Sequence, residues 1–182
     1  EQMMHSAIQV VLIGIMAPAV NRITASPKLN VVGCGVLGTR VAKEWLERYP
    51  DSDVCGETVS SKRHDELRTL GIRPLLREAR PKNDKYARLC ENCFVMISSG
   101  GVYAEDQGGI CFETSPVTAS ARAQKLLKAE AAALKVGAVI RLAGLYTLDR
   151  GAHVFWYAKT TVDAIPDSFI NLVHYDDAAT AT

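Results

Sequence analysis

The chain has 182 residues, of which 48% are hydrophobic and 23% are charged. This balance is typical of a soluble globular domain. A formal net charge of +1 gives no basic surface for nucleic acid or an anionic membrane, so neither partner is expected. Cys90 and Cys93 are the one close cysteine pair. They lack the second pair or the histidines of a zinc site, so no metal is predicted.

Residues 1–28 are expected to be an N-terminal extension. Residues 7–20 form an apolar run about as long as a signal-peptide core and too short to span a bilayer comfortably. Residues 2–28 contain no acidic side chain, which organelle transit peptides tolerate. A leader remnant and a strand or helix packed on the domain both remain open.

The first predicted elements form a strand, a glycine-rich loop, a helix and a second strand. Residues 29–32 are a short apolar run ending at glycine, as a buried strand does. Residues 39–49 place Val41, Trp45 and Leu46 on one helical face. Residues 54–59 are the second predicted strand. This order is the context that a GxGxxG motif needs in order to bind a dinucleotide.

The loop Gly33-Cys34-Gly35-Val36-Leu37-Gly38 has the GxGxxG spacing. Gly33 permits a tight turn, Gly35 lets the backbone approach a pyrophosphate, and Gly38 lets the helix pack closely on the strand. The amides at the start of the helix, from Val36 and Leu37 onward, would face the phosphates with the positive end of the helix dipole. These residues predict a nicotinamide dinucleotide site.

Residues after the second strand favour NADP. The acidic side chain that normally binds the ribose 2′-hydroxyl is replaced by Thr58, about twenty residues after the loop. Lys62 and Arg63 follow it, and a cluster of hydroxyls and cations suits a 2′-phosphate. Two alternatives stay open. Lys62 and Arg63 are also compatible with a solvated helix start, and Glu57 would favour NAD if it faced the ribose.

The rest of the chain continues the alternation of strands and helices. Helices are expected over 64–70, 120–135 and 157–164, and strands over 94–97, 138–142 and 171–173. The run 73–93 has no apolar stretch able to form a buried strand. The predicted fold is α/β, a Rossmann-like parallel sheet with helices on both faces that lacks one strand–helix unit. Residues 29–182 would form a single domain with a small substrate region around 144–170.

Several runs together resemble the NAD-dependent epimerase/dehydratase family of the short-chain dehydrogenase/reductase superfamily, in its atypical extended branch. The chain looks like an internally shortened, C-terminally truncated member. The resemblance covers residues 29–73 and 94–179. It rests on the glycine loop and on the runs 97–103, 126–130, 141–146 and 170–179. It implies an NADP-linked or NAD-linked oxidoreductase or epimerase acting on a nucleotide-sugar-like or other carbonyl substrate. It also suggests a plastid or cytoplasmic location.

The resemblance implies roles for individual residues. Ser98 is expected at the cofactor, Ser99 at the substrate oxygen, and Tyr103 is the candidate acid, with a packing role as its alternative. The family's catalytic tyrosine and lysine align with Arg122 and Leu126, so that pair is missing.

Two function classes therefore stay open, an enzyme and a catalytically silent NADP-binding sensor or scaffold. Arg122, Arg150 and His153 are candidate substrate contacts. Asp177 is expected to cap a helix that starts at Ala178.

Overall fold

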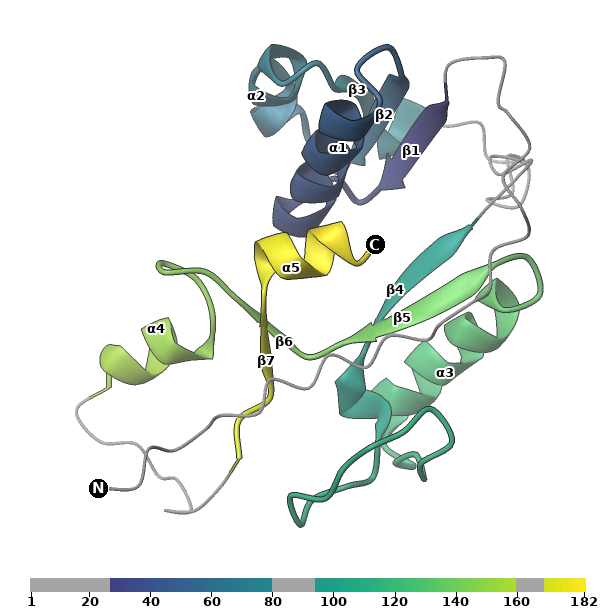
Figure 1. Ribbon diagram of the computed structural model, residues 1–182, viewed down its shortest axis with the longest axis vertical. Coiled ribbons are helices and arrows are strands. Elements are labelled where there is room, and N and C mark those ends of the chain that lie inside the picture. Colours follow the sequence, from purple (N-terminus) through teal and green to yellow (C-terminus); the bar gives the residue numbers. More distant parts are fainter. Residues whose placement is uncertain (1–26, 80–93, 160–168) are drawn as a thin grey trace. The chain divides into compact units, whose positions relative to one another are not determined.

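The computed structural model describes residues 27–79, 94–159 and 169–182 (Figure 1). These residues belong to two compact units. The first unit contains the described residues 27–79 and 175–182, and the second contains 94–159 and 169–174. Both are built from parallel strands and helices, which confirms the predicted α/β class. The expected N-terminal extension and the shortened middle fall largely on residues 1–26 and 80–93, outside the described residues.

A three-stranded parallel sheet forms the base of the first unit. Its strands are β1 (Lys28–Val32), β2 (Asp53–Thr58) and β3 (Arg73–Leu76), in the order β1-β2-β3. The sequence predicts no buried strand in residues 73–93. Strand β3 lies at the start of this run, but none of its residues is buried. Pro74 lies opposite Gly56 in the register of β2 and β3. A proline is tolerated there because β3 ends the strand order of this sheet, where a missing N–H costs no ladder bond on the open side.

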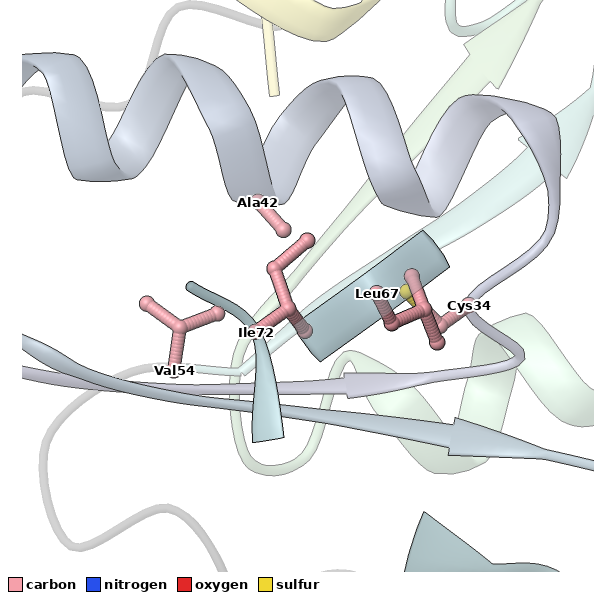
Figure 2. Packing of buried hydrophobic residues seen from close by; sticks show 5 residues of the cluster. All are labelled: Cys34, Ala42, Val54, Leu67 and Ile72. Carbon is pink, nitrogen blue, oxygen red and sulfur yellow. The ribbon is translucent and has the colours of Figure 1, made fainter. Parts of the chain in front are cut away.

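Helix α1 (Val36–Arg48) packs on this sheet and closes the core of the first unit. Figure 2 shows Ala42 of α1 pointing toward Ile72, with Val54, Leu67 and Cys34 in the same cluster. Leu67 comes from α2 (His64–Thr69), which follows a 3-10 turn, η1 (Ser61–Arg63). A second turn, η2 (Arg77–Ala79), follows β3. The strand–loop–helix–strand order predicted from the sequence is confirmed.

The C-terminal helix α5 (Tyr175–Thr180) packs against α1 within the same unit. Tyr175, Ala178 and Ala179 are its buried residues. Arg40 of α1 forms an ion pair with Asp176. The expectation that Asp177 caps a helix starting at Ala178 is wrong, because the helix begins at Tyr175, directly after a strand, and Asp177 lies in its first turn.

The second unit has two short parallel pairs. Strand β4 (Val95–Ser99) pairs with β5 (Ala138–Leu142), and β6 (Gly144–Tyr146) pairs with β7 (Leu172–His174). Helix α3 (Ala121–Ala133) packs on β4 and begins at Ser120, whose hydroxyl accepts a hydrogen bond from the Ala123 amide. A 3-10 turn, η4 (Gly100–Val102), follows β4.

Helix α4 (Ala152–Tyr157) ends where a helix was expected to begin. Residues 158 and 159 are not helical, so the predicted start at Tyr157 is wrong. The observed helix contains the aromatic run of Ala152–Tyr157. It follows Gly151, whose φ of +136° suits a turn before a helix. Residues 160–164 of the predicted helix lie outside the described residues.

A substitution at the buried Leu67 tests whether this core stabilises the first unit. Leu67 has no exposed surface, so Leu67→Ala leaves a cavity and is expected to lower the free energy of unfolding by about 3 kcal/mol. Val59→Ala, at a side chain that is 71% exposed, is the control and should change it by less than about 0.5 kcal/mol. Denaturant titration measures both. Equal, small effects would contradict this placement of the core.

Candidate functional site

The glycine loop turns the chain directly from β1 into α1. Gly33 follows Val32 and adopts a φ of +85°, which a residue with a side chain rarely adopts. The Cys34 amide donates to the Glu57 carbonyl at 2.7 Å, and the Gly35 amide donates to the Gly33 carbonyl at 2.7 Å. The first bond ties the loop to β2 and the second tightens the turn. Helix α1 then begins at Val36.

Gly38 and Gly35 have different surroundings in the loop, one close-packed and one open. A Cβ atom at Gly38 would lie 2.7 Å from Cγ1 of Val31 and 3.0 Å from the Gly33 carbonyl oxygen, so only glycine permits this approach of helix to strand. A Cβ atom at Gly35 would meet nothing closer than the Gly33 oxygen at 4.0 Å. The Gly35 backbone therefore borders open space that a ligand can approach, as the sequence predicts.

The start of α1 is suited to an anion. Its N-terminal residue Gly35 offers no side-chain cap, and the first turn contains no acidic residue. The first amides of this 13-residue helix are therefore left without a side-chain acceptor in the described structure. They carry the positive end of the helix dipole, so a pyrophosphate fits this position chemically.

Arg63 lies beside the glycine loop. Its Nη1 donates to the Cys34 carbonyl at 3.5 Å, and its Nη2 donates to Oγ1 of Thr39 at 3.3 Å. Glu66, three residues later, accepts from Nε at 2.8 Å and from Nη2 at 2.7 Å. The hydrogen bond with Glu66 raises the pKa of Arg63. The sequence predicted Arg63 at the cofactor, and the structure brings it to the loop.

Thr58 is the last residue of β2, and Lys62 directly precedes Arg63 in η1. The Thr58 hydroxyl donates to the Ser60 carbonyl at 2.9 Å and lies 2.8 Å from Nε2 of His64. Lys62 is exposed in η1 and forms no ion pair with any described residue. Together with Arg63, these side chains form a group of hydroxyls and cations beyond the end of β2. His64 was not singled out from the sequence, although it directly follows Lys62 and Arg63.

Glu57 points to the opposite face of the sheet from these residues. Successive side chains of a strand alternate between faces, and Val54 faces α1 in the core cluster. The Glu57 side chain is 3% exposed, and its Oε1 accepts a hydrogen bond from Nε of Arg77 at 3.1 Å. The carboxylate is therefore engaged with η2.

The predicted serines of the second unit both make internal hydrogen bonds. Ser98 is buried, and its hydroxyl donates to Oε1 of Glu130 at 2.5 Å. The Ser99 hydroxyl accepts from the Gly101 amide at 3.2 Å and caps the turn η4. The hydroxyl oxygen of Tyr103 is buried and has no hydrogen-bond partner among the described residues. Ser98 and Ser99 thus lie at the end of β4, and Tyr103 follows the turn η4.

A buried ion pair that the sequence did not reveal lies behind these residues. Arg141 of β5 donates from Nη2 to Oε2 of Glu130 at 2.7 Å and from Nε to both carboxylate oxygens. The side chains are 15% and 4% exposed. The Arg141 guanidinium lies 4.9 Å from the centre of the Tyr103 ring, in a cation–π arrangement. Four residues thus link α3, β4, β5 and the segment after β4. We call them the buried network: Ser98, Glu130, Arg141 and Tyr103.

Burial of Glu130 by itself raises its pKa, but hydrogen bonds from Arg141 and Ser98 outweigh burial and hold the pKa below its usual range. The hydrogen bond with Glu130 raises the pKa of Arg141. Both groups therefore stay charged around neutral pH. The sequence indicated only the burial of Glu130, since it shares its spacing with Ala123 and Ala133 on the apolar stripe of α3, and not its partner.

The three predicted substrate contacts lie on separate elements of the second unit. Arg122 is exposed in the first turn of α3. Arg150 closes the turn after β6 through its backbone, where its carbonyl accepts from the Thr147 amide at 2.7 Å. His153 lies in the first turn of α4, with Nε2 3.1 Å from the Leu148 carbonyl and its ring edge-on to Tyr146.

Neither a metal centre nor a membrane span emerges from the described residues. Within residues 27–79, 94–159 and 169–182, no three histidine, cysteine, aspartate or glutamate side chains gather in a way that could hold a metal ion. In the same ranges, no helix is both long and apolar enough to cross a membrane.

Solved structures similar to this chain include two proteins, whereas no family model and no curated protein matches its sequence. One is a functionally unknown conserved protein from Silicibacter pomeroyi, with a TM-score of 0.66 and 19% identity over 84% of this chain and 65% of that chain. The other is a "putative NAD-dependent epimerase/dehydratase" from Methylobacillus flagellatus, with a TM-score of 0.61 and 20% identity over 86% of this chain and 68% of that one. The chain thus spans about two thirds of each structure. The likeness shows that it has their Rossmann-like fold.

The buried network predicts a pH-dependent contribution to stability. Glu130→Gln leaves Arg141 buried without its countercharge and is expected to lower the free energy of unfolding by about 3 kcal/mol at neutral pH. Because the pKa of Glu130 is lowered in the folded protein, its contribution is present above the pKa of the unfolded chain, about 4.3, and is lost as the pH falls through the folded pKa. The difference between the two proteins should therefore shrink below about pH 4.

Denaturant titration at several pH values measures this difference. Glu113→Gln, at an exposed carboxylate in the same unit, is the matched control and should cost less than about 0.5 kcal/mol at every pH. A Glu130→Gln protein whose deficit stays constant down to about pH 3 would contradict the assigned direction of the pKa.

Proposed function

We propose that the chain binds NADP at the glycine loop and is a protein of the epimerase/dehydratase type. The observation that carries this proposal is the geometry of the loop, where Gly38 brings α1 onto β1 and Gly35 leaves open space before uncapped amides. The amides of Val36 and Leu37 would bind the pyrophosphate. When bound, the nicotinamide would give or take a hydride at a carbonyl substrate.

The preference for NADP over NAD is supported by where the side chains near the end of β2 lie. Glu57, the side chain that would favour NAD, is buried against Arg77 on the far face of the sheet. Arg63 lies at the loop, and Thr58 and Lys62 add a hydroxyl and a second cation close to it in the sequence. A phosphate dianion gains more from such donors than an uncharged ribose hydroxyl does.

The first candidate activity is that of an oxidoreductase or epimerase acting on a nucleotide-sugar-like or other carbonyl compound. The fold that this chain shares with the Methylobacillus protein supports it. Ser99 would hold the substrate oxygen and Tyr103 would donate the proton. Arg122, Arg150 and His153 would contact an anionic or sugar-like substrate.

The second candidate is a catalytically silent NADP-binding sensor or scaffold. It is favoured by the hydroxyls near β4, because Ser98 is committed to Glu130, Ser99 caps a turn, and the Tyr103 oxygen is buried. Helix α3 also carries Arg122 and Leu126 where the resemblance places a catalytic tyrosine and lysine. An arginine is a poor proton donor because its pKa is very high.

Cofactor titration tests the binding proposal. NADPH is expected to bind saturably and more tightly than NADH, as followed by calorimetry or nicotinamide fluorescence. Gly35→Asp should abolish binding, because a carboxylate would repel the pyrophosphate beside the α1 amides. Gly35→Asn, which has the same size without the charge, is the matched control and should retain more affinity. The φ of Gly35 is −86°, so both variants are expected to fold. A folded wild-type protein that binds neither nucleotide would refute the proposed function.

Turnover assays separate the two candidates. If the chain is an enzyme, NADPH oxidation with a panel of carbonyl compounds and nucleotide sugars should fall at least about 100-fold in Ser99→Ala and in Tyr103→Phe, while the NADPH dissociation constant stays within about twofold. The silent candidate predicts saturable NADPH binding with no hydride transfer to any of them. Hydride transfer that survives both changes would refute the assigned catalytic roles.

A further inference from the structure

The Glu66 carboxylate binds the Arg63 guanidinium with the geometry that a phosphate would use. Glu66 accepts from Nε at 2.8 Å and from Nη2 at 2.7 Å, which is the two-pronged geometry that arginine uses for carboxylates and phosphates alike. On its other side, Arg63 is anchored to the Cys34 carbonyl and the Thr39 hydroxyl. The guanidinium thus stays at the glycine loop while its outer edge is covered by a carboxylate of α2, the helix that follows Arg63.

Glu66 is free to leave this position. Its side chain is 52% exposed, and Arg63 is its one hydrogen-bond or ion-pair partner among the side chains of the described residues. Exposed ion pairs between residues three apart on a helix are weak, because solvent screens them and both side chains lose rotamer freedom. An arriving dianion that reaches Arg63 can therefore displace the carboxylate.

The two anions compete for one cation. A 2′-phosphate carries nearly two negative charges at neutral pH, so it cannot share the guanidinium with a charged Glu66 without strong repulsion. An uncharged ribose 2′-hydroxyl does not impose this conflict. Glu66 therefore lowers the affinity for a phosphorylated ribose and leaves the affinity for an unphosphorylated one unchanged.

We infer that Glu66 is a specificity-determining residue that occupies Arg63 as an internal competitor of the NADP 2′-phosphate. The inference rests on the proposed function and goes beyond it, because it assigns to this chain a residue that limits its own preference for NADP. The side chain would move away from Arg63 on NADP binding and remain in place on NAD binding.

Helix α2 supplies a matched control for the test. Asp65 forms an ion pair with Arg68 at 2.7 Å, also three residues apart, and neither residue contacts the glycine loop through a hydrogen bond in the described structure. Glu66→Gln and Asp65→Asn remove the same charge from adjacent positions with little change in size. Calorimetric titration with NADPH and NADH at about pH 8 keeps the 2′-phosphate a dianion throughout.

Glu66→Gln is expected to tighten NADPH binding by about two- to fivefold and to change NADH binding by no more than the Asp65→Asn control does. In an Arg63→Gln background, the same change should gain no more than Asp65→Asn does, because the contested cation is gone. Circular dichroism confirms that each exposed variant is folded.

Other outcomes overturn the inference. Weaker or unchanged NADPH binding in Glu66→Gln would mean that Glu66 orients Arg63 instead of competing for it. Equal tightening of NADPH and NADH, or the same gain in Asp65→Asn, would reduce the effect to general charge repulsion. Absence of binding by the wild-type protein would instead refute the proposed function and this inference with it.

Discussion

The close approach of α1 to β1 is the constraint on which the first unit depends. With no side chain at Gly38, the helix rests against Val31 and the Gly33 carbonyl, where a Cβ atom would lie within 3.0 Å of both. This contact makes the helix start directly after the strand and turns its first amides toward open space. It also brings Ala42 into the core with Val54, Leu67 and Ile72. A loop of ordinary residues would push the helix outward and lose both the core contact and this placement of the first amides.

The two units use their polar groups in opposite ways. In the first, hydrogen-bonding groups at the end of the sheet remain available, since the α1 amides lack a side-chain cap and Lys62 forms no ion pair with a described residue. In the second, the polar groups at the end of β4 bind each other, because Ser98 and Arg141 both hydrogen-bond to Glu130. A buried charge needs such partners, as its desolvation is costly. This contrast supports nucleotide binding more directly than it supports catalysis.

The sequence predicted local patterns well and long-range contacts poorly. The glycine loop, α1 and Ser120 at the start of α3 follow from short spacings, and the structure confirms each. The bounds of β3 were not predicted because Arg73 and Pro74 interrupt the apolar pattern, and a strand at the end of its sheet needs few apolar residues. The Glu130–Arg141 pair and the orientation of Glu57 were not predictable, since they depend on which strands pair and on which face each side chain lies. The role inferred for Glu66 was not predictable for the same reason, because it depends on the position of Arg63 at the glycine loop.

Amide NMR of the isotope-labelled protein during addition of NADPH tests the central claim, that a dinucleotide binds on the glycine loop, most directly. We predict that the largest shift changes fall on the amides of Gly35, Val36 and Leu37 and extend to the backbone around Arg63, because these groups would face the phosphates. Large changes confined to other elements, with the loop amides unmoved at saturation, would contradict it.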